Sequence, residues 1–134
     1  MIVWLTGNSG SGKTTLANQL KDIYFPDWII LDGDEVRAVY DHDLGFEKFS
    51  RVKNNIRMAR LADLLHRQKF NIIVSSIAPF QIGREIVDKI IDCEWIYLPG
   101  GKTGIEYPYE IPNCKKYQNL HLLALYIESK RKTK

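Results

Sequence analysis

The amino-acid sequence predicts an α/β fold in which a parallel sheet is covered by helices on both faces. Short apolar runs of β-type residues alternate with longer stretches whose apolar residues recur at helical spacing. The first apolar run leads directly into a glycine-rich segment and then an amphipathic stretch, an order typical of phosphate-binding folds. A chain of 134 residues can bury one hydrophobic core, so we expect a single domain over residues 1–134.

The first part of the chain contains two predicted strands and one predicted helix. Residues 2–6 form a short apolar run that is typical of a buried strand. Residues 11–24 place their apolar side chains on one face of a helix, which Pro26 ends. Residues 28–31 are the second predicted strand, and an acidic turn is expected at residues 32–34.

The rest of the chain continues the alternation. Residues 50–68 are the longest predicted helix, and residues 71–76 are the third strand. A helix is expected at residues 79–92, a fourth strand at residues 95–98 and a last helix at residues 117–130. The segment between the last two elements shows no obvious fifth strand.

The predicted connections determine where a ligand should bind. Strands separated by helices of ten or more residues are joined by crossovers, and such strands pair in parallel. Right-handed crossovers place the loops that follow the strands along one rim of the sheet, where ligands of open α/β sheets bind. Residues that follow the strands are therefore the candidates for function.

Eight consecutive residues match the phosphate-binding pattern G-x-x-x-x-G-K-[ST] at every position. They are Gly7, Asn8, Ser9, Gly10, Ser11, Gly12, Lys13 and Thr14. The glycines let the backbone curl so that its N–H groups point at phosphate oxygens, and the following helix adds its dipole. We expect this P-loop, together with Thr15, to bind ATP, with Lys13 on the β- and γ-phosphates and the Thr14 hydroxyl on Mg²⁺. A glycine-rich turn without a ligand is the alternative, and it is disfavoured because strand, loop, lysine, hydroxyl and helix are all in register.

Two carboxylates stand one residue apart after the second strand. Asp32 is expected to orient Mg²⁺ through water, and Asp34 to accept the proton of an attacking hydroxyl group. A plain acidic turn is the alternative, because Asp and Gly favour turns. The nearby P-loop favours the functional interpretation, in which Asp34, Lys13 and Asp32 are the catalytic residues.

Several arginines are candidates for binding an anionic acceptor. Arg37, Arg51 and Arg57 follow the acidic turn or lie near the start of the longest helix. The planar arginine fork binds phosphate or sulfate oxygens bidentately. For each of them a solvated surface arginine is an equal alternative. Arg84, in the helix after the third strand, is a further candidate for contact with a phosphate.

Composition and charge indicate a small-molecule partner. The net charge of +3 is modest, and the basic residues at the C-terminal end are typical of a solvated helix end, so we expect no nucleic acid. The apolar runs are too short to span a bilayer, and the first residues lack the features of a signal peptide. Cys93 and Cys114 are too few for a disulfide framework, so we expect free thiols and a cytoplasmic location.

The order of these motifs resembles the adenylylsulfate kinase family, over most of the chain. The matching segments are residues 7–15, 31–37, 43–46, 55–57, 103–105 and 108–110. The resemblance implies a P-loop NTPase fold of the mononucleotide-kinase type, with MgATP as the donor. It further implies transfer of the γ-phosphate to the ribose 3′-hydroxyl of adenylylsulfate, a reaction of sulfate assimilation. A homodimer is also plausible from the resemblance.

The resemblance also implies an acceptor site. Arg37 and Arg51 would hold the anionic bridge of the acceptor, and Phe46 would stack on its base. The residues expected to bind the acceptor are Arg37, Phe46, Arg51, Asn55, Arg57, Ile77, Lys102, Thr103 and Gly104.

The sequence departs from the family pattern in four places. The family has a long basic lid after the fourth strand, whereas here Leu98 leads almost directly to Lys102. Lys102 replaces an aromatic residue, and Ala78 replaces a serine. One extra residue between Arg51 and Asn55 would rotate the start of the long helix by about 100° if the helix absorbs it. A 3′-hydroxyl kinase for another conjugate, such as a pyrimidine nucleotide, and a lid-less ATP-binding sensor or pseudokinase therefore remain alternatives.

Overall fold

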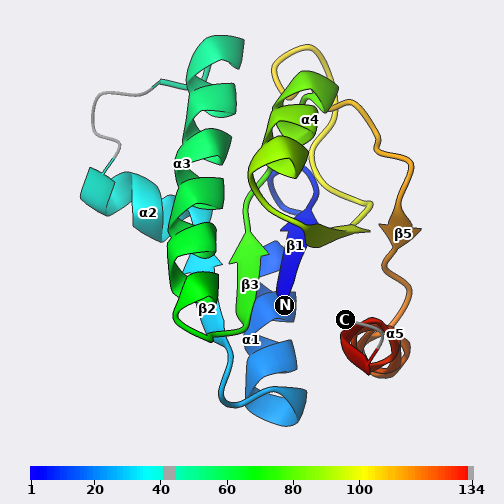
Figure 1. Ribbon diagram of the computed structural model, residues 1–134. Coiled ribbons are helices and arrows are strands. Elements are labelled where there is room, and N and C mark those ends of the chain that lie inside the picture. Colours follow the sequence, from blue (N-terminus) through cyan, green and yellow to red (C-terminus); the bar gives the residue numbers. More distant parts are fainter. Residues whose placement is uncertain (41–44, 133–134) are drawn as a thin grey trace.

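The computed structural model describes residues 1–40 and 45–132, and its five-stranded sheet with flanking helices confirms the predicted α/β class (Figure 1). The strands are β1 (Ile2–Thr6), β2 (Ile29–Asp32), β3 (Ile72–Ser75), β4 (Cys93–Tyr97) and β5 (Lys115–Lys116). The helices are α1 (Lys13–Gln19) with its π-helical continuation η1 (Leu20–Tyr24), α2 (Gly33–Tyr40), α3 (Lys48–Arg67), α4 (Gln81–Ile90) and α5 (Leu120–Lys132).

The sheet has the strand order β2-β3-β1-β4-β5, and every pair in it is parallel. The central strand β1 pairs with β3 on one side and with β4 on the other. Because all strands run in one direction, their carboxyl ends meet at one rim. Thr6 is opposite Tyr97, and Asp32 is opposite Ser75, so these four residues mark that rim.

Apolar side chains along β1 point alternately to the two faces of the sheet, which explains why helices cover both faces. Ile2 and Trp4 point to one face and pack with residues of α2, α3 and α4. Val3 and Leu5 point to the other face and pack with residues of α1, η1 and α5. All four side chains are at most 2% exposed, as expected for a strand buried on both sides.

Two elements differ from the sequence-based prediction. The acidic segment at residues 32–34, predicted as a turn, is instead the junction of β2 and α2, and α2 begins at Gly33. A glycine at this point allows close approach, since an added Cβ would lie 3.1 Å from Ser76 Oγ and 3.3 Å from the Ser75 carbonyl oxygen. The short strand β5, not predicted, extends the sheet by pairing with the end of β4.

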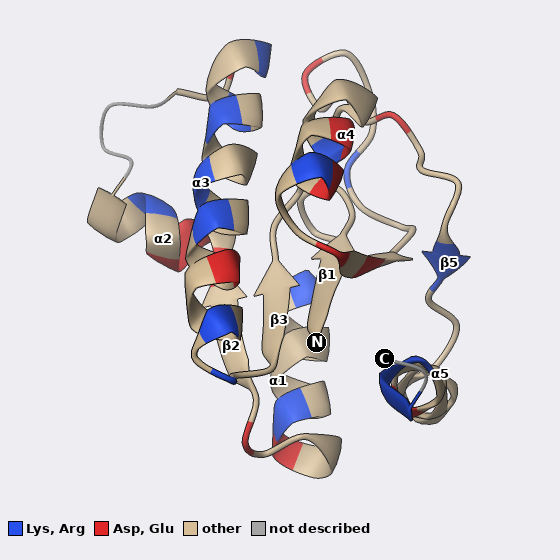
Figure 2. Cartoon of the chain, viewed as in Figure 1, with Lys and Arg blue, Asp and Glu red and all other residues tan. Residues whose placement is uncertain are grey.

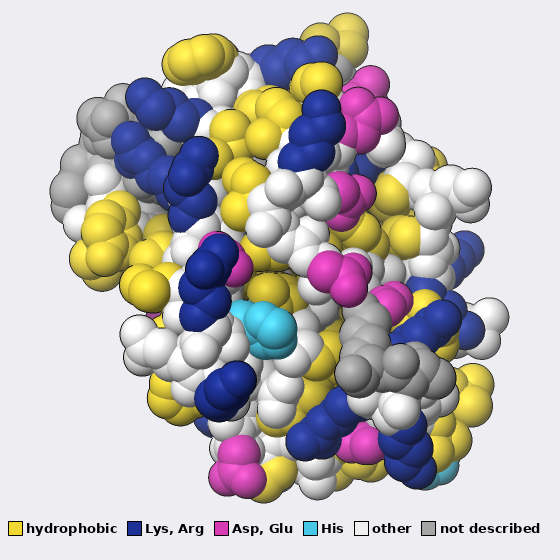
Figure 3. Space-filling model, in the orientation of Figure 1, with side chains coloured by type: hydrophobic (Ala, Val, Ile, Leu, Met, Phe, Trp, Pro, Cys, Tyr) yellow, Lys and Arg dark blue, Asp and Glu magenta, His cyan; other side chains and the backbone are white. Residues whose placement is uncertain are grey.

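Charge is unevenly distributed over the described surface. Lys and Arg residues recur along α3 (Figure 2), and their side chains gather on the corresponding side of the molecule (Figure 3).

Within residues 1–40 and 45–132, no helix combines the length and the apolar character needed to cross a bilayer.

Candidate active site

The P-loop connects β1 to α1 at the rim of the sheet. Gly10 and Gly12 have φ angles of 81° and 94°, a left-handed backbone that favours glycine. Gly12 immediately precedes α1, so the curled loop leads directly into the helix N-terminus. Gly7 is needed for another reason, because a Cβ there would lie 2.5 Å from the carbonyl oxygen of Leu98.

Asp32 connects the P-loop to α2 through both of its carboxylate oxygens. The Thr14 hydroxyl donates a hydrogen bond to Asp32 Oδ2 (2.8 Å), and the backbone N–H of Asp34 donates one to Asp32 Oδ1 (2.8 Å). Asp32 is 7% exposed, whereas Asp34, in the first turn of α2, is exposed. The two carboxylates thus have different environments, one engaged within the protein and one accessible.

Lys13 is partly buried beside these carboxylates. Its Nζ donates hydrogen bonds to the carbonyl oxygen of Asn8 (3.1 Å) and to Ser11 Oγ (3.4 Å). Burial lowers the pKa of Lys13 to about 8, and the negative charges of Asp34 and Asp32 oppose part of that decrease. An ammonium group that has lost part of its hydration is well suited to bind a phosphate.

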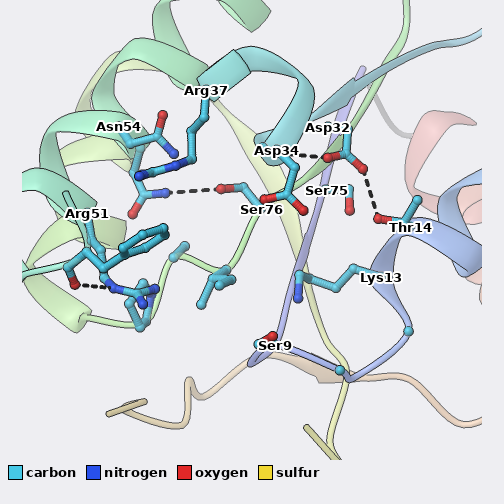
Figure 4. Close-up of a pocket in the computed structure, with 18 of the residues that line it drawn as sticks. Ser9, Lys13, Thr14, Asp32, Asp34, Arg37, Arg51, Asn54, Ser75 and Ser76 are labelled. Carbon is cyan, nitrogen blue, oxygen red and sulfur yellow. Dashed lines mark hydrogen bonds between the residues drawn. The ribbon is translucent and has the colours of Figure 1, made fainter. Parts of the chain in front are cut away.

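One cavity of about 280 Å³ brings most of the predicted site residues together. The predicted residues that line it are Ser9, Gly10, Gly12, Lys13, Thr14, Thr15, Asp32, Asp34, Arg37, Phe46, Arg51, Asn55 and Ile77. Lys13 and Thr14 are at one end, Arg37 and Arg51 are at the other, and Asp34 is between them (Figure 4). The cavity therefore has a phosphate end and an arginine end with an accessible carboxylate in between.

The arginine end is built around Phe46, whose side chain is 71% exposed. The guanidinium carbon of Arg37 lies 4.5 Å from the centre of the Phe46 ring, and that of Arg51 lies 5.6 Å from it. Arg51 Nε donates to the Phe46 carbonyl oxygen (2.6 Å), and Arg37 Nη2 donates to the Gly45 carbonyl oxygen (3.1 Å). Burial, and then the positive charge of Arg37, lowers the pKa of Arg51. Two neighbouring cations of this kind favour an anion between them.

Arg51 and Asn55 line the same cavity despite the extra residue between them. They are four residues apart in α3 and therefore share a helix face. Asn55 Nδ2 donates to Ser76 Oγ (3.4 Å), which connects α3 to the end of β3.

Asn54, Ser75 and Ser76 also line the cavity and were not predicted. Asn54 Oδ1 and Ser75 Oγ are buried and have no hydrogen-bond partner within the described part of the chain. Ser75 ends β3 and Ser76 follows it at the rim, so the rule that ligands bind at the carboxyl ends of strands could have identified them. Asn54 had no comparable signal in the sequence.

The comparison with protein families matches the expectation from the site. The sequence model described as adenylylsulphate kinase matches residues 1–98. The chain belongs to the adenylylsulfate kinase family. This confirms the predicted family, and the fold class with it.

Adenylyl-sulfate kinase of Bacillus pumilus is 40% identical over 94 residues, which are 68% of this chain and 48% of that protein. The probable adenylyl-sulfate kinase of Bacillus subtilis is 38% identical over 142 residues, covering 84% of this chain and 72% of the relative. The bifunctional enzyme NodQ of Rhizobium tropici is 39% identical and covers 97% of this chain, but the match is only 25% of NodQ. This chain thus spans about half the length of the B. pumilus relative and a smaller part of NodQ.

Solved structures give the same fold. The Mycobacterium tuberculosis APS kinase CysC in complex with AMPPNP and APS superposes with a TM-score of 0.82 at 25% identity, over 96% of this chain and 95% of that one. A gluconokinase from Sinorhizobium meliloti, 14% identical with a TM-score of 0.58 over 74% of this chain and 57% of its own, shares the fold alone.

The lack of a lid after Leu98 remains a prediction. The alignment with the B. subtilis relative is 142 residues long although it covers only 84% of a 134-residue chain. That relative therefore has residues with no counterpart in this chain. The family match ends at residue 98.

Three residues of the predicted acceptor site line a different cavity of this family member. Lys102, Thr103 and Gly104 surround a hollow of about 240 Å³ together with Asn8 and Tyr107. Arg57 lines neither this hollow nor the larger cavity, as far as the described residues show. The acceptor roles of these four residues remain predictions.

Arg84 lines neither of these two cavities and instead binds backbone carbonyl groups. Its side chain is 3% exposed and donates to the carbonyl oxygens of Ala78 (2.6 Å) and Glu110 (2.6 Å). Burial lowers its pKa, while Tyr109 and Glu110 oppose the decrease. Tyr109 itself shares a 2.7 Å hydrogen bond with Thr6 Oγ1 and stacks on Tyr97. The predicted phosphate contact of Arg84 is therefore replaced by a role in holding the segment around Glu110.

Proposed function

We propose that this chain transfers the γ-phosphate of MgATP to the ribose 3′-hydroxyl of adenylylsulfate. The observation that carries the proposal is a single cavity with a P-loop at one end, paired arginines at the other and the Asp34 carboxylate between them. A donor phosphate and an anionic acceptor bound at the two ends would meet at Asp34. The M. tuberculosis APS kinase of the same fold, which is bound to AMPPNP and APS, supports the choice of an ATP-like donor and adenylylsulfate as the two ligands.

At the donor end, Lys13 and the P-loop backbone would bind the phosphates of ATP. The N–H groups of the curled loop and the helix that follows it provide positive potential. Lys13 adds a full positive charge beside the β- and γ-phosphates.

The oxygen groups beside Lys13 fit Mg²⁺. Thr14 Oγ1, the Asp32 carboxylate and Ser75 Oγ, which is buried and has no hydrogen-bond partner among the described residues, are hard oxygen donors on neighbouring elements. Thr14 and Asp32 would hold the ion, directly or through water, and the Ser75 hydroxyl would bond to a water in its shell. When bound, Mg²⁺ neutralises charge on the phosphates.

Asp34 would act as the general base. The acceptor hydroxyl transfers its proton to the Asp34 carboxylate while its oxygen bonds to the γ-phosphorus. The bond between the γ-phosphorus and the β–γ bridging oxygen breaks, and its electron pair stays on that oxygen, which leaves as part of ADP. The backbone N–H of Asp34 donates a hydrogen bond to Asp32, and this bond positions the Asp34 carboxylate at the start of α2.

At the acceptor end, Arg37 and Arg51 would bind the anionic bridge of adenylylsulfate, and Phe46 would stack on the adenine. Asn55 and Ile77 would complete the wall. Contact with Lys102, Thr103 or Gly104 would require the segment that carries them to reach around the P-loop.

The test is transfer of labelled γ-phosphate from MgATP to adenylylsulfate by the wild type and by Asp34→Asn. We expect labelled 3′-phosphorylated product from the wild type and a loss of at least about 100-fold in the variant, with ATP affinity nearly unchanged. An active Asp34→Asn enzyme would refute the assigned base. A wild type that binds ATP tightly but yields no labelled product would reject adenylylsulfate as the acceptor.

A second candidate is a 3′-hydroxyl kinase for another nucleotide conjugate, such as one with a pyrimidine base. The observation that favours it is the position of Lys102 in the smaller cavity, which leaves Phe46 as a one-sided platform for the base. A panel of acceptors in single-turnover reactions separates the two activities. Failure of transfer to every member would favour an ATP-binding sensor.

A further inference from the structure

The side chain of Asn8 faces away from the phosphate cavity, although Asn8 is the second residue of the P-loop. Asn8 is 8% exposed and lines only the smaller of the two cavities described above. Its Nδ2 donates to the carbonyl oxygens of Lys102 (2.8 Å) and Tyr107 (2.8 Å). Its Oδ1 accepts a hydrogen bond from the backbone N–H of Ser9 (2.9 Å). Both donors and the acceptor of this amide are thus used within the protein.

The segment that Asn8 binds, residues 99–112, also contacts the P-loop through its backbone. The N–H of Lys102 donates to the Ser9 carbonyl oxygen (2.8 Å). Gly101 packs so closely that an added Cβ would lie 2.7 Å from the Asn8 carbonyl oxygen. The glycine at this position is therefore required by the approach of the two loops.

The backbone of Asn8 reaches the catalytic lysine. Lys13 Nζ donates to the Asn8 carbonyl oxygen (3.1 Å), and Lys13 itself lines the phosphate cavity. The same residue therefore binds Lys13 with its main chain and residues 99–112 with its side chain. A displacement of that segment would move the carbonyl group that orients Lys13.

We infer that Asn8 is a positioning residue that fixes the P-loop against residues 99–112, so that ATP affinity depends on contacts outside the phosphate cavity. The inference rests on the proposed function only for ATP binding at the P-loop, and it involves no acceptor. It differs from the sequence-based expectation that Asn8 binds ATP, because the amide group bonds to Lys102, Tyr107 and Ser9 and does not line the phosphate cavity.

Two variants test the inference from the two sides of the contact. Asn8→Ala removes both side-chain donors, and Gly101→Ala inserts a methyl group from the opposite loop without altering any P-loop residue. We expect each to weaken ATP binding about tenfold, measured by calorimetry without an acceptor. We also expect faster hydrogen exchange at the amides of Lys102 and Tyr107. Asn18→Ala is the matched control, since its exposed amide makes one bond, to the Thr14 carbonyl oxygen (3.0 Å), and should leave both measurements unchanged.

The outcomes discriminate among the interpretations. Weaker binding in Asn8→Ala with wild-type affinity in Gly101→Ala would overturn the inference and indicate direct contact of Asn8 with ATP. Wild-type affinity and exchange in both variants would also overturn it. If Asn8→Ala fails to fold, Gly101→Ala gives the result alone. A wild type that fails to phosphorylate adenylylsulfate affects the proposed function but leaves this test intact, because only ATP binding is measured.

Discussion

Lys13 links pH to nucleotide affinity because burial lowers its pKa to about 8 in the empty site. Below pH 8 the ammonium group is charged and can neutralise phosphate. Above pH 8 the empty site holds a neutral amine, and bound phosphate must raise the pKa again, so binding takes up a proton. We expect ATP affinity to fall as the pH rises above about 8, and Lys13→Met to remove that dependence. Calorimetry in buffers of different ionisation enthalpy measures the proton uptake, and none above pH 8 would contradict the assignment.

The same pKa shift has the opposite effect on the stability of the unliganded protein. A lysine whose pKa is lowered on folding binds fewer protons in the folded state than in the unfolded state. The cost of burying its charge is fully present below pH 8 and is relieved as the pH rises towards its ordinary value of 10.5. We expect the free energy of unfolding of the wild type to increase over this range relative to Lys13→Met. Urea titrations of both proteins at several pH values would measure the difference.

At the scale of elements, Arg84 in α4 holds together two segments that are distant in sequence. It donates to the carbonyl groups of Ala78 and Glu110, which precede α4 and β5 respectively. Replacement by methionine would leave the buried carbonyl oxygen of Ala78 and the partly buried one of Glu110 without this donor, so Arg84→Met should lower the free energy of unfolding by about 3 kcal/mol. Urea denaturation is the measurement. If the free energy of unfolding falls no more than it does when an exposed arginine is replaced, the contacts of Arg84 contribute little to stability.

Arg67→Met is the control for this prediction. Arg67 forms an ion pair with Asp63 at 3.1 Å, but its side chain is 75% exposed. Exposed pairs at i,i+4 contribute about 0.5 kcal/mol or less, so this variant should remain close to the wild type.

The elements that the sequence predicts well are those with long apolar patterns. The four long predicted helices and the first four strands exist because each buries a continuous apolar face, which is visible in the sequence. The helix α2 was not predicted because Asp32, Gly33 and Asp34 have turn propensities, which tertiary contacts override. β5 is only two exposed lysines long and has no apolar signal.

Of the residues of the candidate site, the sequence predicts well those that belong to local motifs. The P-loop and the two aspartates are local motifs, and most of their residues line one cavity, as expected for residues that follow parallel strands. The separation of Lys102 from Phe46 depends on how residues 99–112 fold back on the P-loop. That path is determined by contacts between residues far apart in sequence, such as Asn8 with Tyr107, which no local pattern records.

At the scale of the whole molecule, the sheet separates two hydrophobic clusters that should nevertheless unfold together. Leu20 belongs to the cluster on one face and Met58 to that on the other, and both are fully buried. Leu20→Ala and Met58→Ala should each lower the free energy of unfolding by about 2–5 kcal/mol. If the chain is one domain, both variants retain a single cooperative transition by circular dichroism and tryptophan fluorescence. Two separated transitions would contradict a single domain.

Met1 and the last described turn of α5 lie close together, which has a practical consequence. Met1 and Arg131 line the same surface hollow, and the N-terminal amine donates to Asn71 Oδ1 (2.7 Å) at the amino-terminal edge of the sheet (Figure 1). The P-loop cavity lies at the carboxyl-terminal edge, the opposite pole of the strands. A fluorophore, an affinity handle or a solid support attached at either end would therefore leave the nucleotide entrance unobstructed. A short linker joining the ends would likewise permit circular permutation with the new termini placed in an exposed loop.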